Sequence, residues 1–449
     1  MSTLTTDTLT ITEFGRKLRA HELTAEQATE DCLRRIEADN ARLNAFILVM
    51  GDEARAQARA ADRELAAGRD HGPLHGVPIS LKDLLDVRGT PTTAASHVRD
   101  GHIAERDAPS VAHLRQAGAV FVGKTNLHEF AFGTTNEDSA YGPARNPHDP
   151  QRSPGGSSGG SAASVAAGMA LATIGTDTGG SIRIPAAACG IVGFKPSFGD
   201  VSTDGVVPLS RTFDHIGPLA RTVTDAWLVY GGLLGGAIAK PPAPAPVSGL
   251  RLAVLRGYFC EVLDDEVRSR FEEGLEKLRR AGARIDEVEI RHARDIGPAY
   301  LHISVTDAAA YHAATLETMP EKYTPNVRLR LEMGRYMTGE DYVRALAGRE
   351  VLRREVDAAL AGHDALVLPT LPIPAPLIGA ATVKVGAIEE PVRNLMLRLT
   401  SLFNMTGHPA IALPNGTTSS GMPCSAQLVG VRGQADALVR VALAFESRM

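Results

Sequence analysis

The chain has 449 residues, of which 44% are hydrophobic and 22% charged, and its formal net charge is −5. Basic and acidic residues are interspersed, which argues against nucleic acid or an anionic membrane surface as the main partner. The four cysteines are far apart and form no CxxC pair, so a reducing, cytoplasmic location is expected. The first 15 residues lack the basic and apolar segments of a secretory signal, and no apolar run is long enough to span a bilayer.

Residues 1–70 are expected to form an N-terminal helical layer. Thr24, followed three residues later by Gln27, has the form of a capping box at the start of a helix. Residues 52–68 carry alanine, arginine and glutamate at helical density and end in glycine. We therefore predict helix throughout this segment, covering a core formed by later residues.

Residues 71–239 alternate between helix and strand in the manner of an α/β protein. Residues 77–82 alternate apolar and other side chains, which predicts a strand. Residues 111–117 are expected to be helical and residues 119–122 to form the next strand. Residues 171–175 predict a buried strand within the stretch richest in glycine and serine.

The remaining sequence predicts an insertion followed by a return to the same sheet. The proline-rich segment 241–246 is a stiff linker. Residues 240–365 are expected to be mostly helical and to shape a pocket, with a strand at 252–255 and a charged helix at 265–280. Residues 366–449 are expected to complete the sheet. Their predicted elements are strands near 364–370, 410–414 and 425–429 and a final helix over 436–446.

Two glycine-flanked serine loops lie close together in the sequence. The first reads GGSSGG (155–160) and the second TGGS (178–181). Glycine permits close backbone approach, so such loops can turn several N–H groups toward one point. Donors of that kind stabilise the oxyanion of a tetrahedral intermediate. A flexible linker is the alternative, but apolar residues flank the second loop on both sides, which is untypical of linkers.

A serine nucleophile needs a base, and two arrangements are available. Residues 155–159 match the GxSxG elbow of α/β-hydrolases, which requires a strand directly before it. The preceding residues 145–154 are polar and proline-rich, so that context fails. Lys82, at the end of a predicted strand, is the other candidate and would have to be buried to be neutral. On the residues alone, a solvated lysine paired with Asp83 is the favoured interpretation.

Residues 72–220 resemble the amidase signature family, and the likeness extends over nearly the whole chain. The matching segments are 76–83 (GVPISLKD), 123–130 (GKTNLHEF), 141–147 (YGPARNP), 154–161 (PGGSSGGS), 176–185 (TDTGGSIRIP), 189–196 (CGIVGFKP), 403–411 (FNMTGHPAI) and 427–430 (QLVG). The 24-residue step from Ser157 to Ser181 also fits the family's two-serine arrangement.

The resemblance implies a Ser–cis-Ser–Lys triad. By position, Ser181 is the nucleophile, Ser157, on a cis peptide bond, is the proton bridge, and Lys82 is the base. It further implies an oxyanion hole made by backbone N–H groups, and from the residues themselves we expect neighbouring side chains to hydrogen-bond or form an ion pair without reacting. The oxyanion residues are Thr178, Gly179, Gly180 and Ser181, and the supporting residues are Ser158, Asp177 and Arg183.

The family also implies an α/β fold with one large domain, whose central mixed sheet carries helices on both faces. The expected activity is hydrolysis of a carboxylic amide through an acyl-enzyme, without metal or cofactor. The substrate is expected to be a small amide or carbamate, and a homodimer is a family-level expectation. Two alternatives stay open within the family: a carbamate or urea hydrolase of carboxybiuret-like type, and the glutaminase subunit of a tRNA-dependent amidotransferase.

Overall fold

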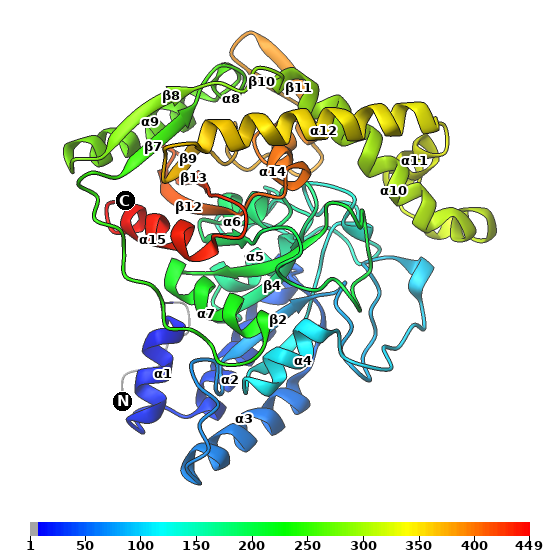
Figure 1. Cartoon of the computed structure of the whole chain (residues 1–449). Coiled ribbons are helices and arrows are strands. Elements are labelled where there is room, and N and C mark those ends of the chain that lie inside the picture. Colours follow the sequence, from blue (N-terminus) through cyan, green and yellow to red (C-terminus); the bar gives the residue numbers. More distant parts are fainter. Residues whose placement is uncertain (1–7) are drawn as a thin grey trace.

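The computed structural model describes residues 8–449. Eleven strands join in one sheet, with helices packed around it, and a separate two-stranded hairpin lies apart (Figure 1). The sheet strands are β1 (Phe46–Val49), β2 (Pro78–Lys82), β3 (Val120–Thr125), β4 (Ala172–Asp177), β5 (Val192–Lys195), β6 (His215–Ala220), β7 (Arg251–Leu255), β8 (Arg284–Val288), β9 (Ala365–Pro369), β12 (Ala410–Thr417) and β13 (Pro423–Val429). The hairpin is β10 (Thr382–Val385) and β11 (Ile388–Pro391).

The helices are distributed along the whole described chain. They are α1 (Ile11–Arg19), α2 (Ala25–Leu43), α3 (Gly51–Ala66), α4 (Pro109–Gln116), α5 (Gly159–Ala166), α6 (Arg183–Cys189), α7 (Val223–Leu234), α8 (Tyr258–Glu261), α9 (Asp265–Arg280), α10 (Ile296–Thr318), α11 (Pro325–Gly334), α12 (Gly339–Leu360), α13 (Val392–Arg398), α14 (Ser401–Met405) and α15 (Ala435–Glu446). The expected capping box is confirmed at the start of α2, where Thr24 and Gln27 exchange hydrogen bonds.

The sheet is mixed, as expected, and its order is β1-β3-β2-β4-β6-β5-β12-β13-β9-β7-β8. β2 lies between β3 and β4 and is parallel to both, whereas β6 runs antiparallel to β4. In the register of β2 and β4, Leu81 lies opposite Ile174. Because parallel neighbours end at the same edge, the last residues of β2 and β4 come together there.

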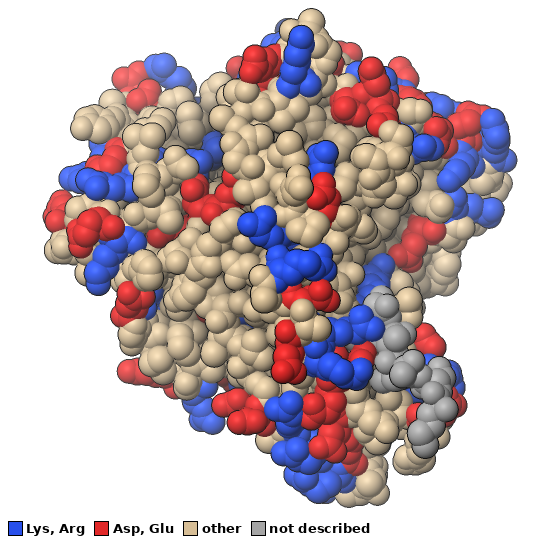
Figure 2. All heavy atoms as spheres, turned by 180° about the vertical axis from the view of Figure 1, so that it is seen from behind, with Lys and Arg blue, Asp and Glu red and all other residues tan. Residues whose placement is uncertain are grey.

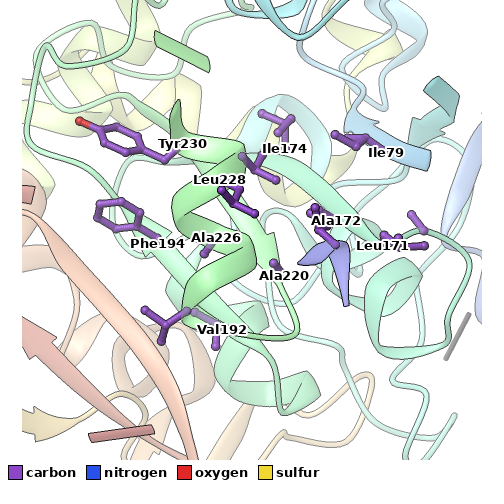
Figure 3. Close-up of a cluster of buried hydrophobic side chains, with 14 of the residues drawn as sticks. Ile79, Leu171, Ala172, Ile174, Val192, Phe194, Ala220, Ala226, Leu228 and Tyr230 are labelled. Atoms are coloured by element: carbon purple, nitrogen blue, oxygen red, sulfur yellow. The ribbon is translucent and has the colours of Figure 1, made fainter. Parts of the chain in front are cut away.

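Side chains alternate between the two faces along each strand. Because every residue of β2 and β4 is buried, both faces of these strands are covered by helices. Ile79, Ala172 and Ile174 point toward α7 and pack with Leu228 (Figure 3). The intervening Ser80 points the other way, where its hydroxyl lies 3.0 Å from Ser164 Oγ of α5. The small residues of α5, GGSAASVA, let this helix approach the strand ends closely.

The sequence prediction missed the inner strands β5 and β6, the hairpin strands β10 and β11, and two further strands, β1 and β8. Residues 46–49 form β1 instead of helix, and β8 interrupts the charged helical region between α9 and α10. Both are edge strands of the sheet. The side chains of β8 are exposed or half-buried throughout, so the strand carries no apolar alternation that a sequence pattern could detect.

Beyond β8, helices α10, α11 and α12 extend from the sheet as one packed group (Figure 1). On the face drawn in Figure 2, basic and acidic side chains are interspersed, in keeping with the small net charge. Within residues 8–449, the structure has no helix with the length and apolar character needed to cross a membrane.

Candidate active site

The ends of two strands and the starts of two helices meet at one edge of the sheet. β2 ends at Lys82, and its parallel neighbour β4 ends at Asp177. Helix α5 begins two residues after Ser157, and helix α6 begins two residues after Ser181. The fold thereby brings together a lysine, a carboxylate and two serine loops that the sequence separates by up to 99 residues.

The Lys82 amine is fully buried among hydroxyl groups. Its Nζ lies 2.7 Å from Ser157 Oγ, 2.9 Å from Ser158 Oγ and 2.7 Å from Thr176 Oγ1. Hydroxyls can donate to a neutral amine or accept from a charged one. The three contacts therefore hold the nitrogen in place in either protonation state.

Burial lowers the pKa of Lys82 from its ordinary 10.5 to about 7. The carboxylates of Asp177 and Asp214 act in the opposite direction, because negative charge favours the ammonium form. No carboxylate forms an ion pair with Lys82 among residues 8–449, so desolvation dominates. The amine is consequently available as a base near neutral pH.

Asp83, the alternative partner for Lys82, pairs with a different lysine. Its carboxylate lies 2.7 Å from Lys124 Nζ, and both side chains are buried. The interpretation of Lys82 as a solvated lysine bound to Asp83 is therefore wrong.

The two serine loops are held against each other. The N–H of Ser158 donates to the Ser181 carbonyl at 3.3 Å, and the peptide bond between Gly156 and Ser157 is cis. Ser157 is wholly buried beside Lys82, whereas Ser181 keeps 6% of its surface exposed. Of the two serines proposed to react, Ser181 is thus the one that a molecule from outside can reach.

The loop from Thr178 to Ser181 presents free backbone donors. Among residues 8–449, the N–H groups of Gly179, Gly180 and Ser181 have no hydrogen-bond acceptor. The loop is fixed from outside instead, because Thr178 Oγ1 donates to Asp214 at 2.6 Å and Thr400 Oγ1 donates to the Gly179 carbonyl at 2.6 Å. Fixed N–H groups without partners can receive an oxyanion.

Gly180 is required in this loop. Its φ of +139° lies outside the range that other residues favour, and a Cβ there would come within 2.3 Å of Thr400 Oγ1. Any side chain at this position would therefore push the loop away from Thr400.

Asp177 and Arg183 form a buried ion pair under the same loop. Arg183 Nε and Nη2 each donate to the Asp177 carboxylate at 3.0 Å. Further donation from Arg183 reaches the Thr400 carbonyl, Gln427 and Asn404. Burial alone would raise the pKa of Asp177, but the Arg183 charge and hydrogen bonds hold that pKa below its usual range. The pair binds loop residues together and has no contact with Lys82.

Ser161 and Cys189 lie nearby without joining these contacts. The Ser161 hydroxyl lies 2.7 Å from Thr125 Oγ1. The Cys189 thiol donates to the Pro154 carbonyl, and burial raises its pKa, which disfavours the reactive thiolate. Within residues 8–449, no group of three or more histidine, cysteine or acidic residues is placed to hold a metal ion.

Sequence reasoning missed five side chains that complete the site: Thr176, Asp214, Thr400, Asn404 and Gln427. Asn404 and Gln427 belong to the tail segments that resemble the family, so a signal for them existed. Thr176 lies on β4 and opens the segment 176–185 that also resembles the family, so a signal for it existed as well. The other two have no local signal, because their role arises only from contact with the loop.

A cavity of about 440 Å³ opens beside the Gly179 end of the loop. Tyr300 of α10 and Leu397 of α13 line it, and both touch Gly179, since a Cβ on that glycine would lie 2.4 Å from Tyr300 Oη and 2.9 Å from Leu397 Cδ2. Phe213 stacks against Tyr300 with ring centroids 5.7 Å apart and so supports this wall. The cavity thus shares a wall with the proposed oxyanion hole.

Comparison with known proteins places this geometry in context. The family model described as "Amidase" matches residues 27–439. An amidase from Pseudomonas putida is 41% identical over 99% of this chain and 97% of its own length. A crystal structure of an amidase superimposes with a TM-score of 0.93 at 40% identity, covering 98% of this chain and 100% of the other. The structure of a glutamyl-tRNA(Gln) amidotransferase subunit from Thermotoga maritima superimposes at 0.80 with 32% identity, covering 99% and 95%.

Proposed function

Since the chain belongs to the amidase signature family and is a hydrolase of C–N amide bonds, we propose that it cleaves them through an acyl-enzyme on Ser181. Ser157 passes the proton and Lys82 is the base in this proposal. The observation that carries it is the dry Lys82 amine, held 2.7 Å from Ser157 Oγ with its pKa lowered by burial to about 7. A lysine in water would be almost entirely protonated at that pH.

The proposed reaction begins with neutral Lys82. It accepts the Ser157 proton as Ser157 accepts that of Ser181, and the Ser181 oxygen attacks the amide carbon. The resulting oxyanion is held by the free N–H groups of Gly179, Gly180 and Ser181, with Thr178 as a fourth candidate donor. Each such donor contributes about 2.7–4 kcal/mol to the transition state in comparable sites.

In the second half of the reaction, the proton transfers occur in the reverse direction. Lys82 and Ser157 return a proton to the departing nitrogen, because an unprotonated amine is a poor leaving group. The C–N bond breaks and the acyl group stays on Ser181. A water molecule, deprotonated through the same relay, then attacks the ester and releases the carboxylic acid. Asp177 and Arg183 take no proton in this scheme and serve to hold the loop.

Labelling with a serine-directed fluorophosphonate tests the nucleophile. The wild-type protein should be labelled once and should hydrolyse a p-nitroanilide, and Ser181→Ala should lose both properties. Ser161→Ala is the matched control, since this serine is buried in the neighbouring motif 154–161 and its hydroxyl bonds to Thr125. Labelling or turnover that survives in Ser181→Ala would refute the assignment.

The relay has its own test. Lys82→Ala should slow amide hydrolysis more than hydrolysis of the matched ester, because an alcohol leaves without prior protonation more readily than an amine. Equal losses for both substrates would contradict a relay that protonates the leaving group.

A glutaminase role within an amidotransferase is the second candidate, favoured by the likeness to the Thermotoga maritima protein. The stand-alone amidase is better supported, because the TM-score is 0.93 against 0.80 and the identity 40% against 32%. Hydrolysis of a simple amide by the isolated chain would support the stand-alone role. Glutamine hydrolysis that appears only with a partner protein would support the other.

A further inference from the structure

The cavity beside Gly179 contains a guanidinium group without a partner. Arg393, on α13, lines the cavity together with Tyr300 and Leu397. Its Nε is buried, and none of its nitrogens has a hydrogen-bond or ion-pair partner among residues 8–449. A half-buried charge without a partner is unfavourable for the fold, so its retention needs a reason.

The other arginines of the cavity wall are already paired. Arg294 binds Glu261 at 2.8 Å, and Arg398 lies 3.4 Å from the same carboxylate. Arg398 also covers the Tyr258 ring at 3.8 Å from its centroid. Glu390, the carboxylate of the wall, forms no ion pair with Arg393. Arg393 is therefore distinguished from its neighbours by its free donors.

A second half-buried arginine adds to the positive charge. Arg330, on α11, donates to the Phe132 carbonyl at 2.7 Å and has no carboxylate within ion-pair distance among residues 8–449. Burial, followed by the charge of Arg393, lowers the pKa of Arg330 to about 10. The two guanidinium groups repel each other, and an anion between them and the cavity would relieve that repulsion.

The helix sets the distance between Arg393 and the reacting carbon. Leu397, which touches Gly179, follows Arg393 by four residues, so the two side chains share one face of α13. Four residues correspond to about 6 Å along a helix axis. An acyl group on Ser181 with a short chain would therefore extend along this face toward Arg393.

We propose that the substrate carries a carboxylate on a short chain attached to the scissile amide, and that Arg393 binds it. A guanidinium fork matches a carboxylate with two parallel hydrogen bonds, which favours this anion over a point charge. Arg330 supports the site by its field, and Tyr300 forms the wall between the carboxylate and the oxyanion hole. This inference rests on the proposed amide hydrolysis at Ser181.

Two pairs of nearly isosteric substrates test the inference: succinamate with succinamide, and glutaramate with glutaramide. The wild-type protein should prefer the anionic member of at least one pair in kcat/KM. Arg393→Gln should lower kcat/KM for that anion by about 10- to 100-fold, the range for hydrogen bonds to a charged group, and change the diamide by less than about threefold. Arg393→Lys should restore part of the loss. Arg294→Gln, whose partner is Glu261, is the control and should keep the preference.

Binding separates this inference from the proposed function. Succinate or glutarate should bind the wild-type protein in calorimetry and bind Arg393→Gln at least tenfold more weakly. Equal loss for both members of a pair in Arg393→Gln, a wild-type preference for the diamides, or absence of dicarboxylate binding would each overturn the carboxylate site. Failure of fluorophosphonate to label Ser181 would overturn the amidase mechanism alone, because dicarboxylate binding needs no nucleophile.

Discussion

Lowering the pH through about 7 should switch off amide hydrolysis, because Lys82 can accept a proton only as the neutral amine. Burial sets its pKa at about 7, and the nearby carboxylates of Asp177 and Asp214 moderate the shift. The sign follows directly: activity is present above this pKa and is lost as the amine becomes protonated below it.

The size of the effect follows from the same pKa. At pH 7, a lysine of ordinary pKa 10.5 is neutral in about one molecule in 3,000, whereas a pKa of about 7 makes about half of the molecules neutral. Burial thus supplies about a thousandfold more base. Below pH 7, kcat/KM should fall about tenfold per pH unit, and above about pH 8 it should be flat.

The assay is kcat/KM for a p-nitroanilide between pH 5.5 and 9.5. Burial raises the pKa of Asp214 to about 6, so this carboxyl titrates in the same range and must be separated. Asp214→Asn provides the control. Removing a negative charge near Lys82 should move the acidic limb of the pH–activity profile to lower pH without abolishing it. A limb near pH 10 would refute the buried base, and a limb that vanishes in Asp214→Asn would assign the titration to Asp214 instead.

Three further predictions concern stability and the loop. The unfolded chain keeps the Lys82 proton up to about pH 10.5, whereas the folded protein releases it at about pH 7. The free energy of unfolding of the wild type, relative to that of Lys82→Met, should therefore rise by about 3 kcal/mol between pH 7 and 9.5 in urea titrations. A difference that stays constant with pH would contradict the lowered pKa. Asp177→Asn leaves the buried Arg183 without a countercharge and should cost about 3–5 kcal/mol of stability by the same measurement, and a loss under 1 kcal/mol would show that the pair is dispensable. Gly180→Ala should lower kcat about 100-fold or more by displacing the oxyanion donors, and near-normal turnover would show that the loop tolerates a Cβ against Thr400.

Local patterns were sufficient for the two strands that end at the site. The alternation of residues 77–82 predicted β2, and the apolar run at 171–175 predicted β4, because these strands are buried and flanked by turn residues. The charged helix predicted at 265–280 coincides with α9. The sequence also predicted that Lys82 ends a strand and that the two serines lie in glycine-rich loops.

What remained open in the sequence depended on contacts between distant segments. Residues within five positions of Lys82 could not decide whether its amine is wet or dry, since the hydroxyls that enclose it come from residues 75 to 94 positions away. Thr400 closes the loop across 221 residues. The unpaired state of Arg393 is equally invisible, because it depends on which carboxylates other elements bring near.

The Asp177–Arg183 ion pair explains how a buried carboxylate can lie near a lysine that must be neutral. Asp177 favours the protonated form of Lys82, so an uncompensated charge there would work against a neutral base. Arg183 donates two hydrogen bonds to this carboxylate and Asn404 donates a third. The positive charge of Arg183 therefore offsets much of the negative field that Asp177 exerts on Lys82. The Asp177 carboxylate also accepts from the Ile182 N–H at 3.1 Å, which holds the start of α6 two residues after Ser181. In the proposed reaction, Arg183 would therefore act twice without touching the substrate, by holding the loop of the proposed nucleophile and by limiting the field that would keep Lys82 charged.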